Sequence, residues 1–314
     1  MDKRKLGKSS LSVAPLALGC NVFGWTIDEK TSFTILDAFT DAGFNLLDTA
    51  DVYSRWKPGN QGGESETIIG NWLKESGKRE KIVLATKVGS DMGQGKLLTK
   101  KYILNAVEDS LKRLQTDYID LYQTHFDDDK TSVEETLDAY GQLVTEGKVR
   151  VIGASNLSPA RFMASLEASK KFGFPTYQTF QPEYNLYVRD KFEKEIEPIC
   201  VEHQIGVISY FSLASGFLTG KYRSESDLTK SARGGGMKKY MDERGFRILN
   251  VLDQLAQEYN TTQASIALAW VMARPSISAP ISSATSLTQL SDLIKSTEVR
   301  LRQDSIQLLN EASA

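Results

Sequence analysis

The sequence predicts one α/β domain over residues 1–314, folded as a (β/α)8 TIM barrel. Eight short apolar runs recur along the chain, and segments with helical periodicity separate them. The units are evenly spaced without a linker between domains, and no G-x-G-x-x-G fingerprint follows the first run. These observations favour a closed barrel over an open, doubly wound sheet.

The predicted strands are rich in Val, Ile, Leu and aromatic residues, which is typical of strands buried in a parallel sheet. They cover residues 15–20, 45–50, 81–88, 118–125, 149–156, 177–184, 205–214 and 277–284. Because helices join them, neighbouring strands pair in parallel through right-handed crossovers. The carboxyl ends of the strands therefore meet at one end of the barrel.

Helices are predicted between the strands wherever apolar residues recur on one helical face. The clearest stripes are Ile68, Ile69, Trp72 and Leu73; Ile103, Val107, Leu111 and Leu114; and Ile248, Val251, Leu252 and Leu255. Thr99 and Ser158 precede two helical segments as N-caps, and Pro159 follows Ser158 in the first helical turn.

Two segments interrupt the alternation of strands and helices. Residues 5–13 are expected to form a short hairpin that covers the lower end of the barrel. Residues 215–245 form a long loop between the seventh strand and its helix. Loops of this length in compact domains are usually functional or disordered.

Composition excludes several classes of function. The net charge is −2 and no long basic run occurs, so we expect no nucleic-acid partner. No apolar stretch is long enough to span a bilayer or resembles a signal peptide, so no membrane partner is expected. Two cysteines give no disulfide framework, which predicts a reducing, cytoplasmic setting. The two cysteines and two histidines have no metal-ligand spacing, so no metal site is expected.

Polar residues follow three successive predicted strands at their carboxyl ends, where barrel enzymes place their chemistry. Asp48 and Tyr53 follow the second strand, Lys87 ends the third and His125 ends the fourth. Each residue alone is more often a cap, a packing residue or a structural histidine. Their occurrence together at one rim is harder to explain in that way and predicts a catalytic cluster.

The cluster suits proton transfer to a carbonyl oxygen. A carboxylate at Asp48 keeps a buried Lys87 protonated, and Lys87 is then expected to lower the pKa of Tyr53 from its usual value near ~10. Tyr53 becomes a general acid, and a neutral His125 orients the substrate oxygen. No activated Ser or Cys nucleophile is evident, so a cofactor must supply the attacking hydride.

The chain resembles the aldo-keto reductase superfamily over essentially its whole length. The matching stretches are LDTADVY, LATKVG, YIDLYQTHFDDD, VIGASN, FQPEYN, ASGFLTGKY and ATSLTQL. It looks closest to the bacterial branch that is similar to the potassium-channel β-subunits. The resemblance implies an oxidoreductase that reduces small aldehydes or ketones, with Asp48, Tyr53, Lys87 and His125 as catalytic tetrad.

The resemblance also implies a nicotinamide site. Ser155, Asn156 and Gln181 would bind the carboxamide, Tyr210 would stack on the ring, and the pyrophosphate would follow the start of the long loop. The implied cofactor-binding positions are Cys20, Asp48, Ser155, Asn156, Gln181, Tyr210, Leu213, Gly216, Lys221, Ser283, Thr285 and Gln289.

The basic residues of the long loop suit a lid over phosphate groups, and Arg233 is the preferred phosphate ligand. The expected cofactor is NADPH, with NADH as the alternative. Where the family often has Gly-Ala-Arg after the last strand, this chain has Ser283-Ala284-Thr285, which weakens the preference for the 2′-phosphate. Trp25 and Trp56 are expected to join Tyr53 and His125 in the substrate pocket.

Two alternatives remain at this stage. The protein could be a nicotinamide-binding regulatory subunit with incidental reductase activity. Alternatively, Lys87 could act as a Schiff-base nucleophile, as in barrel aldolases. That second chemistry leaves Tyr210, Gln181 and the basic loop without a role.

Overall fold

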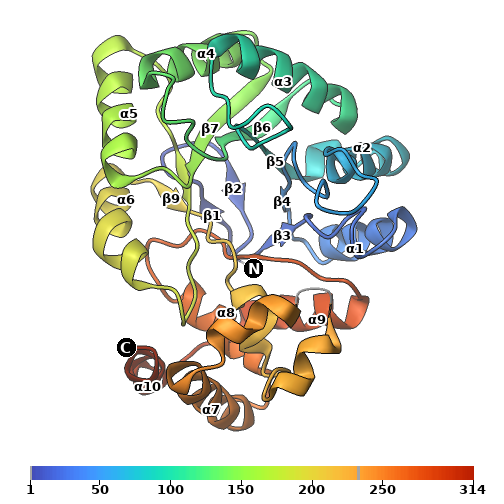
Figure 1. The fold of residues 1–314 in the computed structure, drawn as a ribbon, viewed down its shortest axis with the longest axis vertical. Helices are drawn as coiled ribbons and strands as arrows, with labels where there is room; N and C mark the ends of the chain where they lie inside the picture. Colours follow the sequence, from blue (N-terminus) through green and yellow to red (C-terminus); the bar gives the residue numbers. More distant parts are fainter. Residues whose placement is uncertain (1, 232–233) are drawn as a thin grey trace.

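A computed structural model describes residues 2–231 and 234–314 of the protein. Its main sheet has parallel strands in the order β10-β3-β4-β5-β6-β7-β8-β9, with helices around the outside (Figure 1). The strands are β3 (Ala17–Gly19), β4 (Leu46–Asp48), β5 (Val83–Val88), β6 (Ile119–Thr124), β7 (Val149–Ser155), β8 (Thr179–Gln181), β9 (Gly206–Val207) and β10 (Ile281–Ser282). Hydrogen bonds from Ser278 N to Val207 O and from Ile281 N to Ser209 O, both 2.8 Å, join β9 to the segment at β10. The predicted barrel is confirmed, although the strands are shorter than the apolar runs.

The helices pack their apolar faces toward the barrel. They are α1 (Glu29–Asp41), α2 (Glu64–Ser76), α3 (Lys100–Leu114), α4 (Val133–Thr145), α5 (Pro159–Phe172), α6 (Glu197–His203), α7 (Glu243–Glu258), α8 (Gln263–Met272), α9 (Leu287–Lys295) and α10 (Gln303–Ala312). The three predicted apolar stripes lie in α2, α3 and α7. Thr99 and Ser158 cap α3 and α5 as predicted, because their side chains accept hydrogen bonds from Tyr102 N and Arg161 N.

The N-terminal hairpin covers the lower end of the barrel. It consists of β1 (Arg4–Lys5) and β2 (Ser12–Val13), which pair antiparallel. Leu6, Leu11 and Val13 are buried in one apolar cluster with residues that line the barrel interior. Burying each such side chain contributes about 1.5–3 kcal/mol, so the hairpin helps to hold the barrel interior together.

The long loop after β9 is more ordered than the sequence suggests. It contains the short 3-10 helices η3 (Ala214–Thr219), η4 (Glu225–Lys230) and η5 (Gly234–Tyr240) before α7 begins. Three of its basic residues are paired with carboxylates, in the ion pairs Arg223–Asp253, Lys230–Asp227 and Lys238–Glu225. Much of the loop's positive charge is therefore neutralised locally, unlike in the predicted basic lid.

The described ranges contain no helix that is long and apolar enough to cross a membrane. Within those same ranges, no group of three or more His, Cys, Asp or Glu residues could hold a metal ion.

Candidate active site

Strand alternation places the predicted catalytic residues inside the barrel, next to its apolar interior. Leu46, Ala85 and Leu121 belong to the buried cluster that fills the barrel. Side chains two residues apart on a strand point to the same face. Asp48 follows Leu46 by two residues, and Lys87 follows Ala85 in the same way. Both charged groups therefore face the barrel axis at the carboxyl end of the sheet.

Lys87 is the centre of a buried ionic cluster. Its Nζ donates hydrogen bonds to Asp48 Oδ2 at 2.7 Å, to the carbonyl oxygen of Thr49 at 2.8 Å and to Tyr53 OH at 3.0 Å. Burial alone lowers the pKa of Lys87, but attraction to Asp48 and Tyr53 outweighs burial, and the net pKa is raised. The ammonium group therefore stays charged, as the sequence predicts.

Tyr53 lies in the turn after β4, partly buried, with its hydroxyl group on Lys87. Burial raises the pKa of Tyr53 to about 12, although Lys87 acts in the opposite direction. The expected net lowering of this pKa is wrong, because desolvation of the phenol exceeds the effect of the ammonium group. A phenol with this pKa is protonated at neutral pH, which is the state that a proton donor requires.

His125 follows β6 and stands edge-on to Tyr53, with the ring centroids 5.9 Å apart. The imidazole is buried, and burial followed by repulsion from Lys87 lowers its pKa well below the usual value. Within the described residues, its Nδ1 has no hydrogen-bond partner. The ring is thus neutral near pH 7, the form that can donate a single hydrogen bond to a carbonyl oxygen.

A chain of hydrogen bonds connects Asp48 to the strands β7, β8 and β9. Gln181 Nε2 donates to Asp48 Oδ1 at 2.8 Å, and Ser155 Oγ donates to the carbonyl oxygen of Gln181 at 2.8 Å. Asn156 Nδ2 donates to Ser155 Oγ at 3.0 Å, and Tyr210 OH donates to Asn156 Oδ1 at 2.9 Å. The structure therefore brings these four predicted cofactor residues together beside the tetrad.

Gln123 and Phe126 also contact the cluster, and the sequence interpretation missed both. Gln123 Nε2 donates a hydrogen bond to Asp48 Oδ1 at 3.3 Å, and the Phe126 ring stacks on His125 with the ring centroids 4.7 Å apart. Gln123 could have been found, because it precedes His125 by two residues and so shares its strand face. No comparable pattern marks Phe126, whose position depends on the loop after β6.

The other predicted cofactor residues near the first and last strands form separate small contacts. Cys20 follows β3, and its backbone N donates to the carbonyl oxygen of Asp48 at 2.9 Å. Ser283 Oγ donates to Asn21 Oδ1 at 2.7 Å. The backbone N of Thr285 donates to the Gln289 side chain at 2.9 Å. Among the described residues, the side chains of Ser283, Thr285 and Gln289 make no hydrogen bond to the tetrad.

The start of the long loop has an unusual backbone. Residues 214–216 all have positive φ, at 48°, 56° and 103°. Only the last of these, Gly216, adopts such a value without strain, and strained backbone of this kind concentrates at ligand sites. Lys221 lies close to this segment. Its Nζ is 3.6 Å from the position that a Cβ atom at Gly216 would occupy. Leu213 is partly buried beside it, and Arg233 lies outside the described residues.

Two tryptophans extend the site outward from Tyr53. The ring centroids of Tyr53 and Trp56 are 5.9 Å apart, and those of Trp56 and Trp25 are 5.5 Å apart. Trp56 is 46% exposed, so much of its indole surface remains free at the rim. The structure thus places Trp56 beside Tyr53 and Trp25 beside Trp56.

Comparison with known proteins agrees with this geometry. The model of the Aldo/keto reductase family matches residues 15–314. The chain belongs to the aldo-keto reductase family. It is 36% identical to an uncharacterized oxidoreductase of Bacillus subtilis, YrpG, over 99% of this chain and 95% of the relative.

Two other members of the family show how varied its roles are. A probable voltage-gated potassium channel subunit beta of Arabidopsis thaliana is 33% identical over 95% of this chain and 92% of its own length. A norsolorinic acid reductase of Aspergillus flavus is 32% identical over 97% of this chain and 79% of its own length. Membership of the aldo-keto reductase family identifies the chain as an oxidoreductase, and the family generally uses NAD(P)H.

Proposed function

We propose that the protein reduces aldehydes or ketones to alcohols, using NADPH, with NADH as the alternative cofactor. The observation that carries this proposal is the 3.0 Å hydrogen bond from Lys87 Nζ to Tyr53 OH. A charged ammonium group held against a protonated phenol can stabilise the phenolate that forms when the proton is donated. This arrangement has a purpose in proton transfer and no evident purpose in packing.

The nicotinamide ring, when bound, supplies hydride to the carbonyl carbon. Tyr53 donates its proton to the carbonyl oxygen, and Lys87 stabilises the phenolate oxygen that remains. Asp48 holds Lys87 in its charged form, because the two groups are 2.7 Å apart inside the barrel. His125, neutral and edge-on to Tyr53, orients the carbonyl oxygen toward the phenol.

The polar groups beside Asp48 fit a nicotinamide carboxamide. Ser155, Asn156 and Gln181 supply hydroxyl and amide groups at the same rim, and Tyr210 is held next to them by its hydrogen bond to Asn156. In our proposal the first three bind the carboxamide and Tyr210 stacks on the ring. Lys221 and the left-handed segment at residues 214–216 contact the pyrophosphate.

The partly exposed indoles of Trp25 and Trp56 favour substrates with an apolar or ring-bearing body. A regulatory role is the second candidate, since a relative is described as a potassium channel subunit. The complete Asp48–Lys87–Tyr53 cluster favours catalysis. Schiff-base chemistry is disfavoured, because Lys87 donates three hydrogen bonds and has a raised pKa, whereas a nucleophilic amine must be neutral.

The decisive experiment titrates the purified protein with NADPH and NADH by fluorescence, and then measures turnover on a panel of aliphatic and aromatic aldehydes. We expect tighter binding of NADPH and cofactor-dependent turnover that is highest with ring-bearing aldehydes. Binding of either nucleotide without turnover on any member of the panel would favour the regulatory candidate.

A further inference from the structure

A cavity lies at the end of the barrel opposite to the tetrad. It has a volume of about 670 Å³ and is bounded by β1, the turns before β3 and β4, the end of α8, and residues 294–301 around η6 (Ser296–Glu298). These are amino-terminal strand ends and the helix–strand turns that feed them, far from the rim where barrel enzymes place their chemistry. Known small-molecule sites enclose roughly 300–1,000 Å³, so the cavity is large enough for a ligand.

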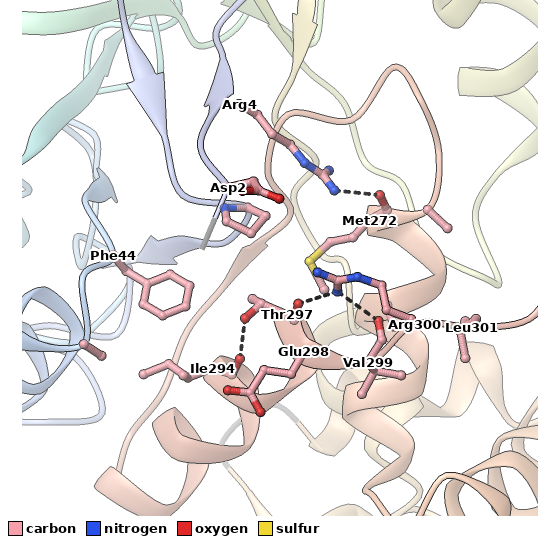
Figure 2. A pocket seen from close by; sticks show the side chains of 14 residues that line it. Asp2, Arg4, Phe44, Met272, Ile294, Thr297, Glu298, Val299, Arg300 and Leu301 are labelled. Atoms are coloured by element: carbon pink, nitrogen blue, oxygen red, sulfur yellow. Dashed lines mark hydrogen bonds between the residues drawn. The ribbon is translucent and has the colours of Figure 1, made fainter.

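One part of the cavity wall is apolar and another is cationic. Phe44, Ile294 and Met272 contribute apolar surface on different sides, while Arg4 and Arg300 bring two guanidinium groups to the α8 side (Figure 2). An interior with apolar surface and a few convergent polar groups is typical of small-molecule sites.

Both guanidinium groups keep hydrogen-bond donors that no atom of residues 2–231 or 234–314 accepts. Arg4 donates to the carbonyl oxygens of Ile277 at 2.9 Å and Met272 at 3.2 Å, and so caps the last residue of α8. Among the described residues, Arg300 donates only to carbonyl oxygens within its own turn, those of Thr297 at 2.6 Å and Val299 at 3.4 Å. A guanidinium group has five N–H donors. The capping of α8 accounts for the position of the Arg4 side chain. It does not account for the position of Arg300, which also lines the cavity.

The cavity wall carries two acids as well as the two arginines. These acids are Asp2 and Glu298, and within residues 2–231 and 234–314 neither forms an ion pair with Arg4 or Arg300. Figure 2 shows the Glu298 carboxylate near Ile294, away from the guanidinium group of Arg300. Burial, and then repulsion from Arg300, lowers the pKa of Arg4. An anion between the arginines would relieve this repulsion.

We propose that the cavity binds a small carboxylate that carries an apolar body. The planar guanidinium of Arg300 matches the two oxygens of a carboxylate, and Arg4 adds a second positive charge. The apolar body lies against Phe44, Met272 and Ile294. This site is separate from the proposed reductase site, and its ligand needs neither the tetrad nor a nicotinamide cofactor.

Octanoate is a suitable probe, because it combines a carboxylate head with an apolar chain. Methyl-labelled methionine provides a local readout: Met272 lines the cavity, whereas Met92 lies at the other end of the barrel, beside Gly62 in the turns that follow Tyr53. The labelled protein is titrated by NMR, with the Met272 signal assigned from a Met272→Leu variant. We expect a saturable shift of the Met272 signal and no shift of the Met92 signal.

Variants and a neutral ligand separate the head-group contact from simple apolar binding. We expect Arg300→Gln to weaken octanoate binding at least tenfold. Arg302→Gln is the matched control, because Arg302 is close in sequence but pairs with Glu258 and Asp304 outside the cavity. Octanol, with the same body and no charge, should bind at least tenfold more weakly. Circular dichroism and reductase turnover check that each variant is folded.

Three results would overturn the proposal: a stationary Met272 signal, equal binding of octanol and octanoate, or undiminished binding by folded Arg300→Gln. Octanoate that shifts only the Met92 signal would also contradict it, since the ligand would then occupy the opposite rim.

Discussion

Lys87 Nζ and Tyr53 OH are joined by a 3.0 Å hydrogen bond, and the same nitrogen lies 4.7 Å from the centroid of the Tyr53 ring. The ammonium group is thus positioned to stabilise negative charge on the phenolic oxygen, even though burial raises the pKa of Tyr53 to about 12. The proposed reduction needs a protonated phenol at the start and a stabilised phenolate at the end. This pair provides for both.

Replacing Tyr53 with Phe removes the donated proton and leaves the ring in place. We expect NADPH binding to be retained and carbonyl reduction to fall by about 10²–10⁴-fold, the usual contribution of a general acid. Steady-state turnover and a parallel fluorescence titration measure the two effects. A variant that keeps more than a few per cent of wild-type turnover would show that Tyr53 is not the acid.

Replacing His125 with Ala separates the reductase mechanism from Schiff-base chemistry. The imidazole is neutral and edge-on to Tyr53, so its loss should remove orientation of the carbonyl oxygen and lower turnover by about 10²–10³-fold, with cofactor binding unchanged. In parallel, wild-type protein is treated with substrate and borohydride and analysed by mass spectrometry. A covalent adduct on Lys87, or a fully active His125→Ala enzyme, would contradict hydride transfer.

Replacing Lys221 with Ala tests the pyrophosphate contact. Its ammonium group lies over the left-handed segment that ends at Gly216, and we expect the Kd for NADPH to rise about tenfold while turnover at saturating cofactor changes little. Lys238→Ala is the control, because Lys238 on the same loop is paired with Glu225. Equal Kd values for the two variants would remove Lys221 from the cofactor site.

The raised pKa of Asp51 predicts that the free energy of unfolding depends on pH in an unusual way. Asp51 is buried, one of its oxygens has no partner among the described residues, and burial followed by repulsion from Glu66 raises its pKa to about 8 against the opposing effect of Arg113. The folded protein therefore favours the protonated acid. Its contribution to stability is complete below about pH 4 and is lost as the pH rises toward 8.

Asp51→Asn should remove this dependence. Each pKa unit corresponds to ~1.4 kcal/mol, so the variant should gain about 2 kcal/mol or more over wild type between pH 4 and pH 8. Urea unfolding at several pH values measures the difference. A difference that is constant over this range would show that Asp51 is already ionised in the folded protein.

The sequence was sufficient to predict the barrel and the grouping of Asp48, Tyr53, Lys87 and His125 at one rim; their catalytic role stays a prediction. Period-two alternation placed Asp48 and Lys87 on the interior face, and strand order placed them at one rim. It was insufficient for the pKa of Tyr53, because the balance between desolvation and attraction to Lys87 depends on how deeply the turn after β4 buries the ring. Gln123 was recoverable from the same alternation that marks His125.

Features that depend on loop conformation could not be predicted from the sequence pattern. The stacking of Phe126 on His125 and the pairing of Lys238 with Glu225 arise from segments without regular periodicity. The opposite-end cavity joins side chains as distant in sequence as Arg4 and Arg300, and no local spacing links them. The apolar runs also overestimated strand length, since a buried run continues to pack after its ladder pairing has ended.

The contact between β9 and β10 closes the barrel, and we expect it to open locally before the rest of the sheet. β9 and β10 have only two residues each, and the β9 segment is joined to residues 276–281 by backbone bonds from Val207 N, Ser278 N, Ala279 N and Ile281 N, whereas β5, β6 and β7 pair over six- and seven-residue strands. Local opening follows the least-bonded backbone. In hydrogen exchange, the amides of these four residues should therefore lose protection before those of β6. Because the strained 214–216 segment follows β9 in the chain, we expect local opening of the β9–β10 contact to let the proposed cofactor loop move, and so release a ligand, without unfolding of the rest of the barrel.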